Sequence, residues 1–277
     1  MDLASLKTIR YILAQHHVHA KKYFGQNFLI NRGVAKKAAA AANIQPTDVI
    51  LEIGPGLGAL TQELAQTAQR VIAVEKDAAM VKILQDTLAH AKNVEILHGD
   101  ILEFNTRYKI QDTKYKVVAN LPFYLTAPVI RKFLEAVEVK PQQMTLMVQK
   151  EVAQRICAKP PDVNLLAVAV QFYAAPMIIA YVKKSSFWPQ PKVDAAILQI
   201  TPFSTNTQVD SRRFFQIVKA AFKQPRKQLL NNLSTGLKLE RQATAQWLLE
   251  NNIQPTQRAQ SLTVQDCINL TDSLRRR

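Results

Sequence analysis

The chain has 277 residues, 48% of them hydrophobic, so it can bury the core of one large domain and a smaller second one. Its formal net charge of +15 indicates a polyanionic partner. The absence of an 18-residue apolar run and of a signal-peptide pattern argues against a membrane span and against export. The only cysteines, Cys157 and Cys267, lie far apart, which favours reduced thiols and a cytoplasmic protein over a disulfide.

The first two predicted elements of the chain are helices at residues 6–15 and 32–42, indicated by the spacing of their apolar residues. The stretch 21–29 between them is polar and aromatic, and its composition alone favours an ordinary loop. His16, His17 and His19 cluster nearby but lack further ligands of a suitable type, so we expect no metal site.

The next stretch combines an apolar run at 49–53, which predicts a buried strand, with a predicted helix at 59–68. Between them stand Gly54, Gly56 and Gly58. Glycine is needed in such a turn because a Cβ would block both the turn and the close approach of a ligand. The N–H groups at the start of the helix favour a polar or anionic ligand. This turn predicts a site for a nucleoside-containing cofactor.

The glycine pattern leaves the cofactor open. Gly54, Gly56 and Ala59 fit the dinucleotide pattern Gly-x-Gly-x-x-Gly/Ala, whereas Gly54, Gly56 and Gly58 fit the Gly-x-Gly-x-Gly of methyltransferases that use S-adenosylmethionine. Glu75 follows Gly54 at the distance where either class places a carboxylate on ribose hydroxyls. The choice therefore depends on other residues.

From residue 49 onward, strands and helices alternate. Strands are predicted at 49–53, 71–75, 94–97, 116–119, 144–149, 177–182 and 195–200, and helices at 59–68, 78–89, 127–137 and 164–173. The alternation predicts an α/β, Rossmann-like fold with a seven-stranded, mostly parallel sheet between helices. Only a loop joins the last two strands, so that pair is a candidate for antiparallel pairing.

The composition changes after Pro202. Four helices and no strand are predicted beyond it, at 211–223, 226–233, 241–251 and 264–275, and Thr263 with Asp266 resembles a capping box. We place a domain boundary near residue 203, which gives a cofactor-binding domain at 1–202 and a small all-α domain at 203–277. The small domain has 12 Lys and Arg against 5 Asp and Glu, and therefore the higher density of positive charge.

Three polar residues follow strand ends: Glu75 closes the second strand, Asp100 follows the third and Asn120 follows the fourth. In a parallel sheet these ends face one crevice, where ligands bind. Asp100 can accept a hydrogen bond from an adenine amine, although a simple turn at this position is an alternative.

The tetrapeptide Asn120-Leu121-Pro122-Phe123 decides between the cofactors. It offers a side-chain carbonyl, backbone carbonyls held rigid by proline, and an aromatic face. An adenine N6 amine is a poor nucleophile, and two carbonyl acceptors on its hydrogens favour a pyramidal nitrogen aimed at a methyl group. A stacked ring fixes a flipped base. The tetrapeptide therefore predicts methyl transfer, because a dehydrogenase would have no use for these groups. The alternative interpretation is a plain Asn-Pro turn after a strand.

Five motifs together resemble the rRNA adenine N6,N6-dimethyltransferase family, its bacterial branch most closely. They lie at residues 22–29, 51–58, 120–123, 149–152 and 187–194, and residues 221–227 and 258–262 also fit. The resemblance implies an enzyme that uses S-adenosyl-L-methionine to dimethylate two adjacent adenines near the 3′ end of 16S rRNA in the small ribosomal subunit. We expect a cytoplasmic monomer with no membrane or metal partner, whose residues 203–277 bind RNA.

The resemblance also implies residue roles. The residues implied to contact the cofactor are Asn27, Leu29, Gly54, Glu75, Asp100 and Asn120. Asn27 and Leu29 belong to the stretch first interpreted as a loop, so the resemblance replaces that interpretation. Within this set, Gly54 would approach the methionine part, Glu75 the ribose and Asp100 the adenine. The catalytic residues would be Asn120, Leu121, Pro122 and Phe123, with Asn120 touching both cofactor and target amine and Phe123 stacking the target base.

The chain departs from the family pattern at three places. Phe123 stands where bacterial members usually have tyrosine, Pro225 and Arg226 stand where two arginines usually precede the lysine, and residues 164–166 replace a commoner basic-Leu-Ser pattern. These departures bear on RNA contacts and not on the reaction.

Three alternatives stay open. A 23S rRNA adenine methylase of the macrolide-resistance type is mildly favoured by Phe123 and opposed by the motif at 187–194 and by the C-terminal pattern. A non-catalytic relative that serves as an assembly or transcription factor is opposed by the intact motifs at 54–58 and 120–123. A nicotinamide enzyme is the most distant alternative.

Overall fold

The computed structural model describes residues 1–21, 24–105, 110, 114–204 and 209–274. The chain forms two compact units, Met1–Ala153 with Pro176–Pro202, and Gln154–Ala175 with Phe203–Arg277. This division differs from the expected domain 1–202 at residues 154–175, which belong to the second compact unit. The reason is packing: Ala167, Val168 and Phe172 are buried in the same apolar cluster as Phe214 of the C-terminal helices.

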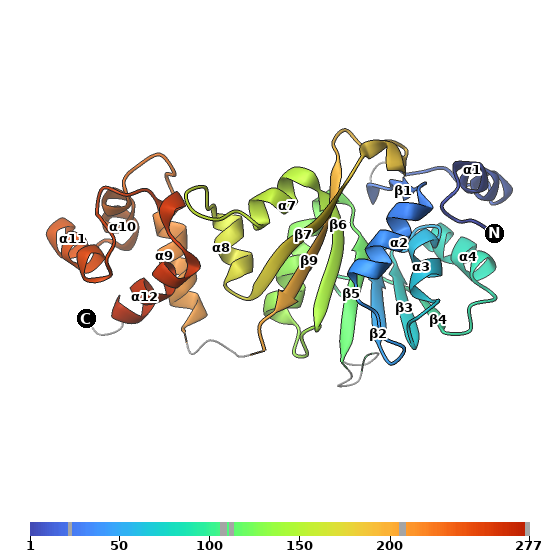
Figure 1. Cartoon of the computed structure of the whole chain (residues 1–277), viewed down its shortest axis with the longest axis horizontal. Coiled ribbons are helices and arrows are strands. Elements are labelled where there is room, and N and C mark those ends of the chain that lie inside the picture. The colour runs from blue at the N-terminus through green and yellow to red at the C-terminus, as the bar shows by residue number, and fades with distance from the viewer. Residues whose placement is uncertain (22–23, 106–109, 111–113, 205–208, 275–277) are drawn as a thin grey trace. The chain divides into compact units, whose positions relative to one another are not determined.

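The first unit is built on a seven-stranded sheet with the order β4-β3-β2-β5-β6-β9-β7 (Figure 1). Its strands are β2 (Val49–Ile53), β3 (Arg70–Glu75), β4 (Val94–His98), β5 (Tyr115–Asn120), β6 (Gln143–Gln149), β7 (Ala174–Val182) and β9 (Ala195–Pro202). Strands β4, β3, β2, β5 and β6 run parallel, and β9 runs antiparallel to β6. This confirms the predicted mostly parallel sheet.

Burial explains why these segments form central strands. Every residue of β2 is buried, as expected for a strand of a parallel sheet covered on both faces. Helices α2 (Arg32–Ala41) and α3 (Ala59–Leu64) place apolar side chains in one cluster with the strands. Figure 1 shows these two helices in front of the strands and the green helical segment of residues 126–136 behind them.

The predicted helix at 127–137 is split into α6 (Thr126–Arg131) and a π-helical turn, η3 (Lys132–Ala136), after the short 3-10 turn η2 (Phe123–Leu125). Helix α7 (Lys150–Ile156) was not predicted. Helices α1 (Leu6–Gln15) and α4 (Ala78–Thr87) agree closely with the sequence and share an apolar cluster with Leu57 of the glycine turn.

The strand order creates a topological switch point at β2. The chain proceeds from β2 to β3 and β4 on one side, then returns to β5 and β6 on the other. Helices therefore leave the carboxyl ends of β2 and β5 in opposite directions, which opens a crevice between them where ligands bind in such folds. The glycine turn follows β2, and Asn120 closes β5.

A second sheet, with only two short strands, was not predicted. Strand β1 (Phe28–Leu29) pairs antiparallel with β8 (Phe187–Trp188), and the Ile30 N–H extends the pairing by donating to the Ser186 carbonyl at 2.8 Å. Two-residue strands have no periodicity to detect. The pairing joins two segments that the sequence had singled out separately, 22–29 and 187–194; Lys22 and Tyr23 lie outside the described residues.

The second unit is helical, as expected. Its helices are α8 (Leu165–Gln171), α9 (Ser211–Ala221), α10 (Leu229–Leu237), α11 (Arg241–Glu250), η5 (Ala259–Ser261) and α12 (Val264–Leu274). The capping box is confirmed, because the Asp266 N–H donates to Thr263 Oγ1 at 3.0 Å and the Thr263 N–H donates to Asp266 Oδ2 at 2.8 Å. The predicted end of the last helix at Arg275 lies outside the described residues.

The helix predicted from Arg226 begins only at Leu229, so Arg226 and Lys227 lie in a turn between α9 and α10. The buried Asn232 side chain fixes this turn, because its Nδ2 donates to the carbonyls of Ala221 at 2.7 Å and Gln224 at 3.0 Å. Asn232 lies in the first turn of α10, outside the loop that it fixes, so the sequence of the loop carries no signal of this role.

Cys267 is a buried thiol, whereas Cys157 is partly exposed. Among the helices that the structure describes, none has the length and apolar character needed to span a bilayer.

Close contact between α9 and α10 depends on Gly236. A Cβ placed on Gly236 would lie 2.7 Å from the Ala220 Cβ, closer than carbon atoms approach without a shift of one helix. We expect Gly236→Ala to lower the free energy of unfolding by up to about 2 kcal/mol. Overpacking costs roughly 1–3 kcal/mol, and the gain of about 1 kcal/mol in helix propensity offsets only part of it.

The measurement is denaturant unfolding followed by the fluorescence of Trp247, which is buried in this unit. Thr235→Ala, at an exposed position of the same helix, is the matched control and should change stability little. Equal or greater stability of Gly236→Ala would show that the two helices separate easily.

Candidate active site

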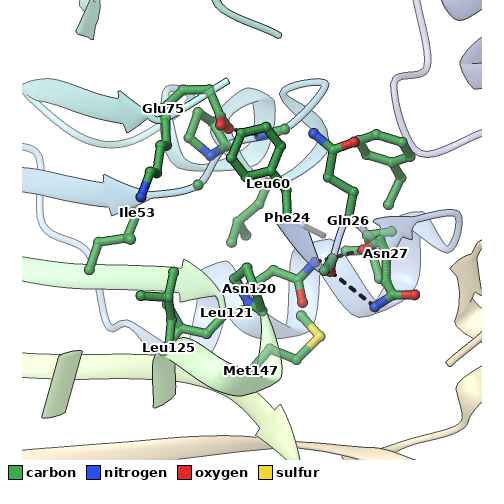
Figure 2. A pocket seen from close by; sticks show the side chains of 18 of the residues that line it. Phe24, Gln26, Asn27, Ile53, Leu60, Glu75, Asn120, Leu121, Leu125 and Met147 are labelled. Carbon is green, nitrogen blue, oxygen red and sulfur yellow. Dashed lines mark hydrogen bonds between the residues drawn. The ribbon is translucent and has the colours of Figure 1, made fainter. Parts of the chain in front are cut away.

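One pocket at the carboxyl edge of the sheet brings together every site residue expected from the sequence. Including its opening to solvent, the pocket contains about 1180 Å³ of space. The nine expected residues that line it are Asn27, Leu29, Gly54, Glu75, Asp100, Asn120, Leu121, Pro122 and Phe123. Figure 2 shows several of them converging from separate strands and loops.

The glycine turn forms one wall. Gly54, Gly56 and Gly58 have φ of +64°, +61° and +88°, a region that favours glycine. A Cβ on Gly54 would meet no atom within 4 Å, so the space beside this backbone is open to a ligand. At Gly56 a Cβ would lie 3.4 Å from Phe28 Cδ1, an ordinary contact, so it is the positive φ and not a lack of space that favours glycine there.

Glu75 connects this turn to the following helix. Its Oε2 accepts from the Gly56 N–H at 3.1 Å, and its Oε1 accepts from the Asp77 N–H at 2.8 Å. The carboxyl group is buried, and burial raises its pKa, although the two backbone donors act in the opposite direction. Each oxygen keeps a further lone pair that can accept from a ligand.

Asp77 extends the connection to the N-terminal segment. While capping α4 through the Ala79 N–H, it also accepts from Lys21 Nζ at 2.9 Å and Gln26 Nε2 at 3.0 Å. A continuous series of hydrogen bonds thus joins Lys21 and Gln26 to the start of α4 and, through Glu75, to the glycine turn.

Asp100 lies at another end of the pocket. Its Oδ2 pairs with Lys76 Nζ at 2.7 Å and its Oδ1 accepts from the Leu102 N–H at 2.9 Å. Burial acts to raise the pKa of Asp100, but the hydrogen bonds from Lys76 and Leu102 outweigh it and lower the pKa. The group is therefore an ionised acceptor at neutral pH.

Asn120 lies at the centre of the pocket with its amide orientation fixed. Its Nδ2 donates to the Asn27 carbonyl at 3.1 Å, and the Asn27 Nδ2 in turn donates to the Gly25 carbonyl at 3.1 Å (Figure 2). Because Nδ2 is engaged, Oδ1 is the atom left to accept, and no described residue donates to it.

The backbone after Asn120 offers a second acceptor. The Leu121 N–H returns to the Met147 carbonyl at 3.1 Å, and the Pro122 carbonyl is used by the Leu125 N–H at 2.9 Å. The Leu121 carbonyl receives no hydrogen bond within the described part of the chain. Of the backbone carbonyls that the sequence suggested beside Pro122, the Leu121 carbonyl is therefore the one left to accept from a ligand.

Sequence reasoning missed Glu52. This side chain in β2 is 1% exposed, lines the pocket, and has an Oε2 without a hydrogen-bond partner in the described residues. Burial raises its pKa to about 8, and the nearby Glu75 adds to the rise. The signal was available: an acidic residue inside an otherwise apolar strand requires a partner. A ligand with a positively charged donor would supply one.

Within the residues described, no group of three or more His, Cys, Asp or Glu is placed to hold a metal ion.

Comparison with known proteins identifies relatives of the whole chain. The sequence pattern of the ribosomal RNA adenine dimethylase family matches residues 17–276. "Ribosomal RNA small subunit methyltransferase A" of Dehalococcoides mccartyi (strain CBDB1) is 43% identical over 250 residues, which cover 89% of this chain and 86% of that protein. The protein of the same name from Alkaliphilus oremlandii is 39% identical over 282 residues, covering 98% of each.

Solved structures share the fold. A dimethyladenosine transferase from Plasmodium falciparum superimposes with a TM-score of 0.76 at 24% identity, over 90% of this chain and 97% of that one. The 23S rRNA methyltransferase ErmE gives 0.73 at 23% identity, over 90% and 100%. At these identities the likeness supports the architecture alone.

The raised pKa of Glu52 predicts a pH dependence. Between about pH 4.5 and pH 8 the folded protein holds a proton on Glu52 that the unfolded chain releases, so stability should fall as pH rises, by up to about 1.4 kcal/mol per unit. Glu52→Gln mimics the protonated form and should remove this component.

The measurement is the free energy of unfolding of the cofactor-free protein across that pH range. Glu103→Gln, at an exposed position, is the control and should run parallel to wild type. Parallel curves for wild type and Glu52→Gln would mean that Glu52 is ionised when folded.

Proposed function

This chain belongs to the ribosomal RNA adenine dimethylase family, and from that premise we propose that it uses S-adenosyl-L-methionine to dimethylate two adjacent adenines near the 3′ end of 16S rRNA. The observation that carries the proposal is the fixed Asn120 amide beside the Leu121 carbonyl, two unused acceptors in one pocket. In this proposal the substrate is the small ribosomal subunit and the enzyme works in the cytoplasm, where that subunit is assembled. That it acts as a monomer stays a prediction.

The pocket fits the cofactor by its donors, acceptors and open space. The uncovered backbone at Gly54 would take the methionine part, and the buried Glu52 Oε2 would accept from its ammonium group. Glu75 would accept from ribose hydroxyls and Asp100 from the adenine amine, and Asn27 and Leu29 also line the pocket. When bound, S-adenosylmethionine supplies an electrophilic methyl group.

The reaction then depends on positioning. Asn120 Oδ1 and the Leu121 carbonyl would each accept one hydrogen of the target amine, which directs its lone pair out of the ring plane. No strong base is required, because the proton can leave after methyl transfer. Correct positioning alone supplies roughly 7–11 kcal/mol of a barrier.

Phe123 supplies the stacking face. Its ring lines the pocket and is half-buried, directly after Pro122, which orients the turn. Stacking of a base on an aromatic ring contributes about 1–3 kcal/mol and requires only the π face. The phenol hydroxyl of the usual tyrosine is therefore unnecessary here.

The 16S target is favoured over a 23S target by the relatives at 39% to 43% identity, whose names specify the small subunit. The resemblance to the 23S rRNA methyltransferase lies in the fold. A non-catalytic role is disfavoured because both acceptors that the proposed reaction requires, Asn120 Oδ1 and the Leu121 carbonyl, are present.

The helical unit would hold the RNA. Its cations on and after α9 form no salt bridge within the described residues; they are Arg212, Arg213, Lys219, Lys223, Arg226 and Lys227. Arg226 and Lys227 are exposed in the turn fixed by Asn232. A base-flipping enzyme must hold a large folded RNA while one adenine leaves its stack, and phosphate contacts provide that hold.

The first test is catalytic. Asn120→Ala should fold but lose most methyl transfer to unmethylated small subunits, because the acceptor that orients the amine is gone. Phe123→Tyr should retain activity, since the stacking face survives. Mass spectrometry of the adenines in the reacted rRNA measures both. Substantial dimethylation by Asn120→Ala would refute the proposed role.

The second test concerns RNA binding. Replacing Arg226 and Lys227 by alanine should reduce the slope of log affinity against log salt by about two, roughly one per lost phosphate contact. The measurement is a titration of small subunits by filter binding at several salt concentrations. The matched control replaces Lys36 and Lys37, exposed cations on α2, and changes the net charge equally. If both variants alter the slope alike, the effect is one of net charge and not of this turn.

A further inference from the structure

Tyr124 is an aromatic residue at the pocket rim that the reaction above does not use. It follows Phe123 in η2, yet its residue surface is 55% exposed, whereas Phe123 is half-buried. No hydrogen bond to its hydroxyl is formed within the described chain. An aromatic side chain in this state gains little from folding, so its surface is available to a ligand.

The backbone beneath the ring defines its position. Gly25 has a φ of +64°, and a Cβ there would lie 3.0 Å from the Pro122 Cβ and 3.5 Å from Tyr124 Cε1. The ring therefore rests beside a glycine that cannot be replaced without displacing Pro122. The backbone that carries the ring is fixed, because the Leu125 N–H donates to the Pro122 carbonyl at 2.9 Å, so stacking of a second flat group restricts only the side-chain rotation.

The surroundings suit a nucleic acid. The Lys76 ammonium is exposed on the same rim; its pKa is raised mainly by the hydrogen bond and charge of Asp100, and to a smaller extent by the Tyr124 phenol, so the two groups lie near each other. An aromatic face beside a cation is the combination on which single-stranded nucleic acids stack.

We propose that Tyr124 is a second nucleobase subsite, at the rim of the catalytic pocket, which stacks the base adjacent to the adenine held by Phe123. The inference rests on the proposed function, in which the two targets are neighbours. Moving one adenine into the pocket breaks its stacking with the other, at a cost of a few kcal/mol. A ring one residue beyond Phe123 restacks the neighbour and offsets part of that cost.

The spacing supports this arrangement. Phe123 and Tyr124 are consecutive residues of the 3-10 turn η2, where successive side chains diverge by roughly a third of a turn, so the half-buried Phe123 and the exposed Tyr124 offer rings to two different bases. Stacking is indifferent to methylation at N6, so the subsite would accept the neighbour both before and after its own modification. The same platform would serve whichever adenine reacts first.

The test uses a stem–loop RNA with two adjacent adenines, one replaced by the fluorescent base 2-aminopurine. This analogue lacks the N6 amine that Asn120 and Leu121 would hold, so adenine enters the pocket and the probe is left at the rim. With saturating wild type and S-adenosylhomocysteine, we expect quenching of the probe by stacking. Tyr124→Ala and Tyr124→Leu should lose the quenching, and Tyr124→Phe and Tyr124→Trp should keep it.

Tyr11→Ala is the matched control, because Tyr11 is 58% exposed on α1 and does not line the pocket. On small subunits, Tyr124→Ala should raise KM by about fivefold or more, equivalent to the lower end of the stacking energy, with kcat little changed. Tyr124→Phe should match wild type in both parameters.

Two results would overturn the inference. One is undiminished quenching of 2-aminopurine by both non-aromatic variants. The other is a loss of S-adenosylhomocysteine affinity by Tyr124→Ala, measured by calorimetry without RNA, that equals its change in KM. The second would assign Tyr124 to the cofactor. The proposed function fails separately, if wild type dimethylates no adenine of the small subunit. Where wild type modifies both adenines and Tyr124→Ala behaves like it, only the second subsite is refuted.

Discussion

The buried Glu75 carboxylate is the point on which the cofactor side of this pocket depends. By accepting one backbone N–H from Gly56 and one from Asp77, it fixes the glycine turn relative to α4. Asp77 then binds Lys21 and Gln26 of the N-terminal segment. Removing this carboxylate would therefore disturb the glycine turn, the start of α4 and the N-terminal segment. The lone pairs that these hydrogen bonds leave unused remain available to a ligand.

The target side is organised by a different constraint, the orientation of one amide. Asn120 can offer either its carbonyl or its NH₂ group to a ligand, and the Asn27 carbonyl decides by occupying the NH₂. An adenine N6 amine donates hydrogen bonds, so the residues that hold it must be hydrogen-bond acceptors and not donors. The close packing of Gly25 on Pro122 holds the two segments together, so a residue in the N-terminal segment sets the chemistry of a loop that follows β5.

The two units divide the physical work. The sheet unit supplies a preorganised pocket with few charges that are not paired, whereas the helical unit has exposed cations around a turn held by a buried asparagine. The buried network gives precise geometry, which salt affects little, and the exposed cations give attraction to phosphate that salt weakens strongly. The assignment of residues 154–175 to the helical unit could not be predicted, because α8 has the composition of any buried helix and its partners are about fifty residues away.

The sequence by itself determined the alternation of strands and helices, the mostly parallel sheet and the glycine turn, because these depend on periodicity or on short motifs. The full set of nine pocket residues came from the resemblance to a known family. Tertiary structure alone decided the pairing of β1 with β8, the unpaired acceptor of Glu52, and the orientation of Asn120. These features arise from contacts between residues distant along the chain, and a local pattern contains no record of which distant group will complete a hydrogen bond.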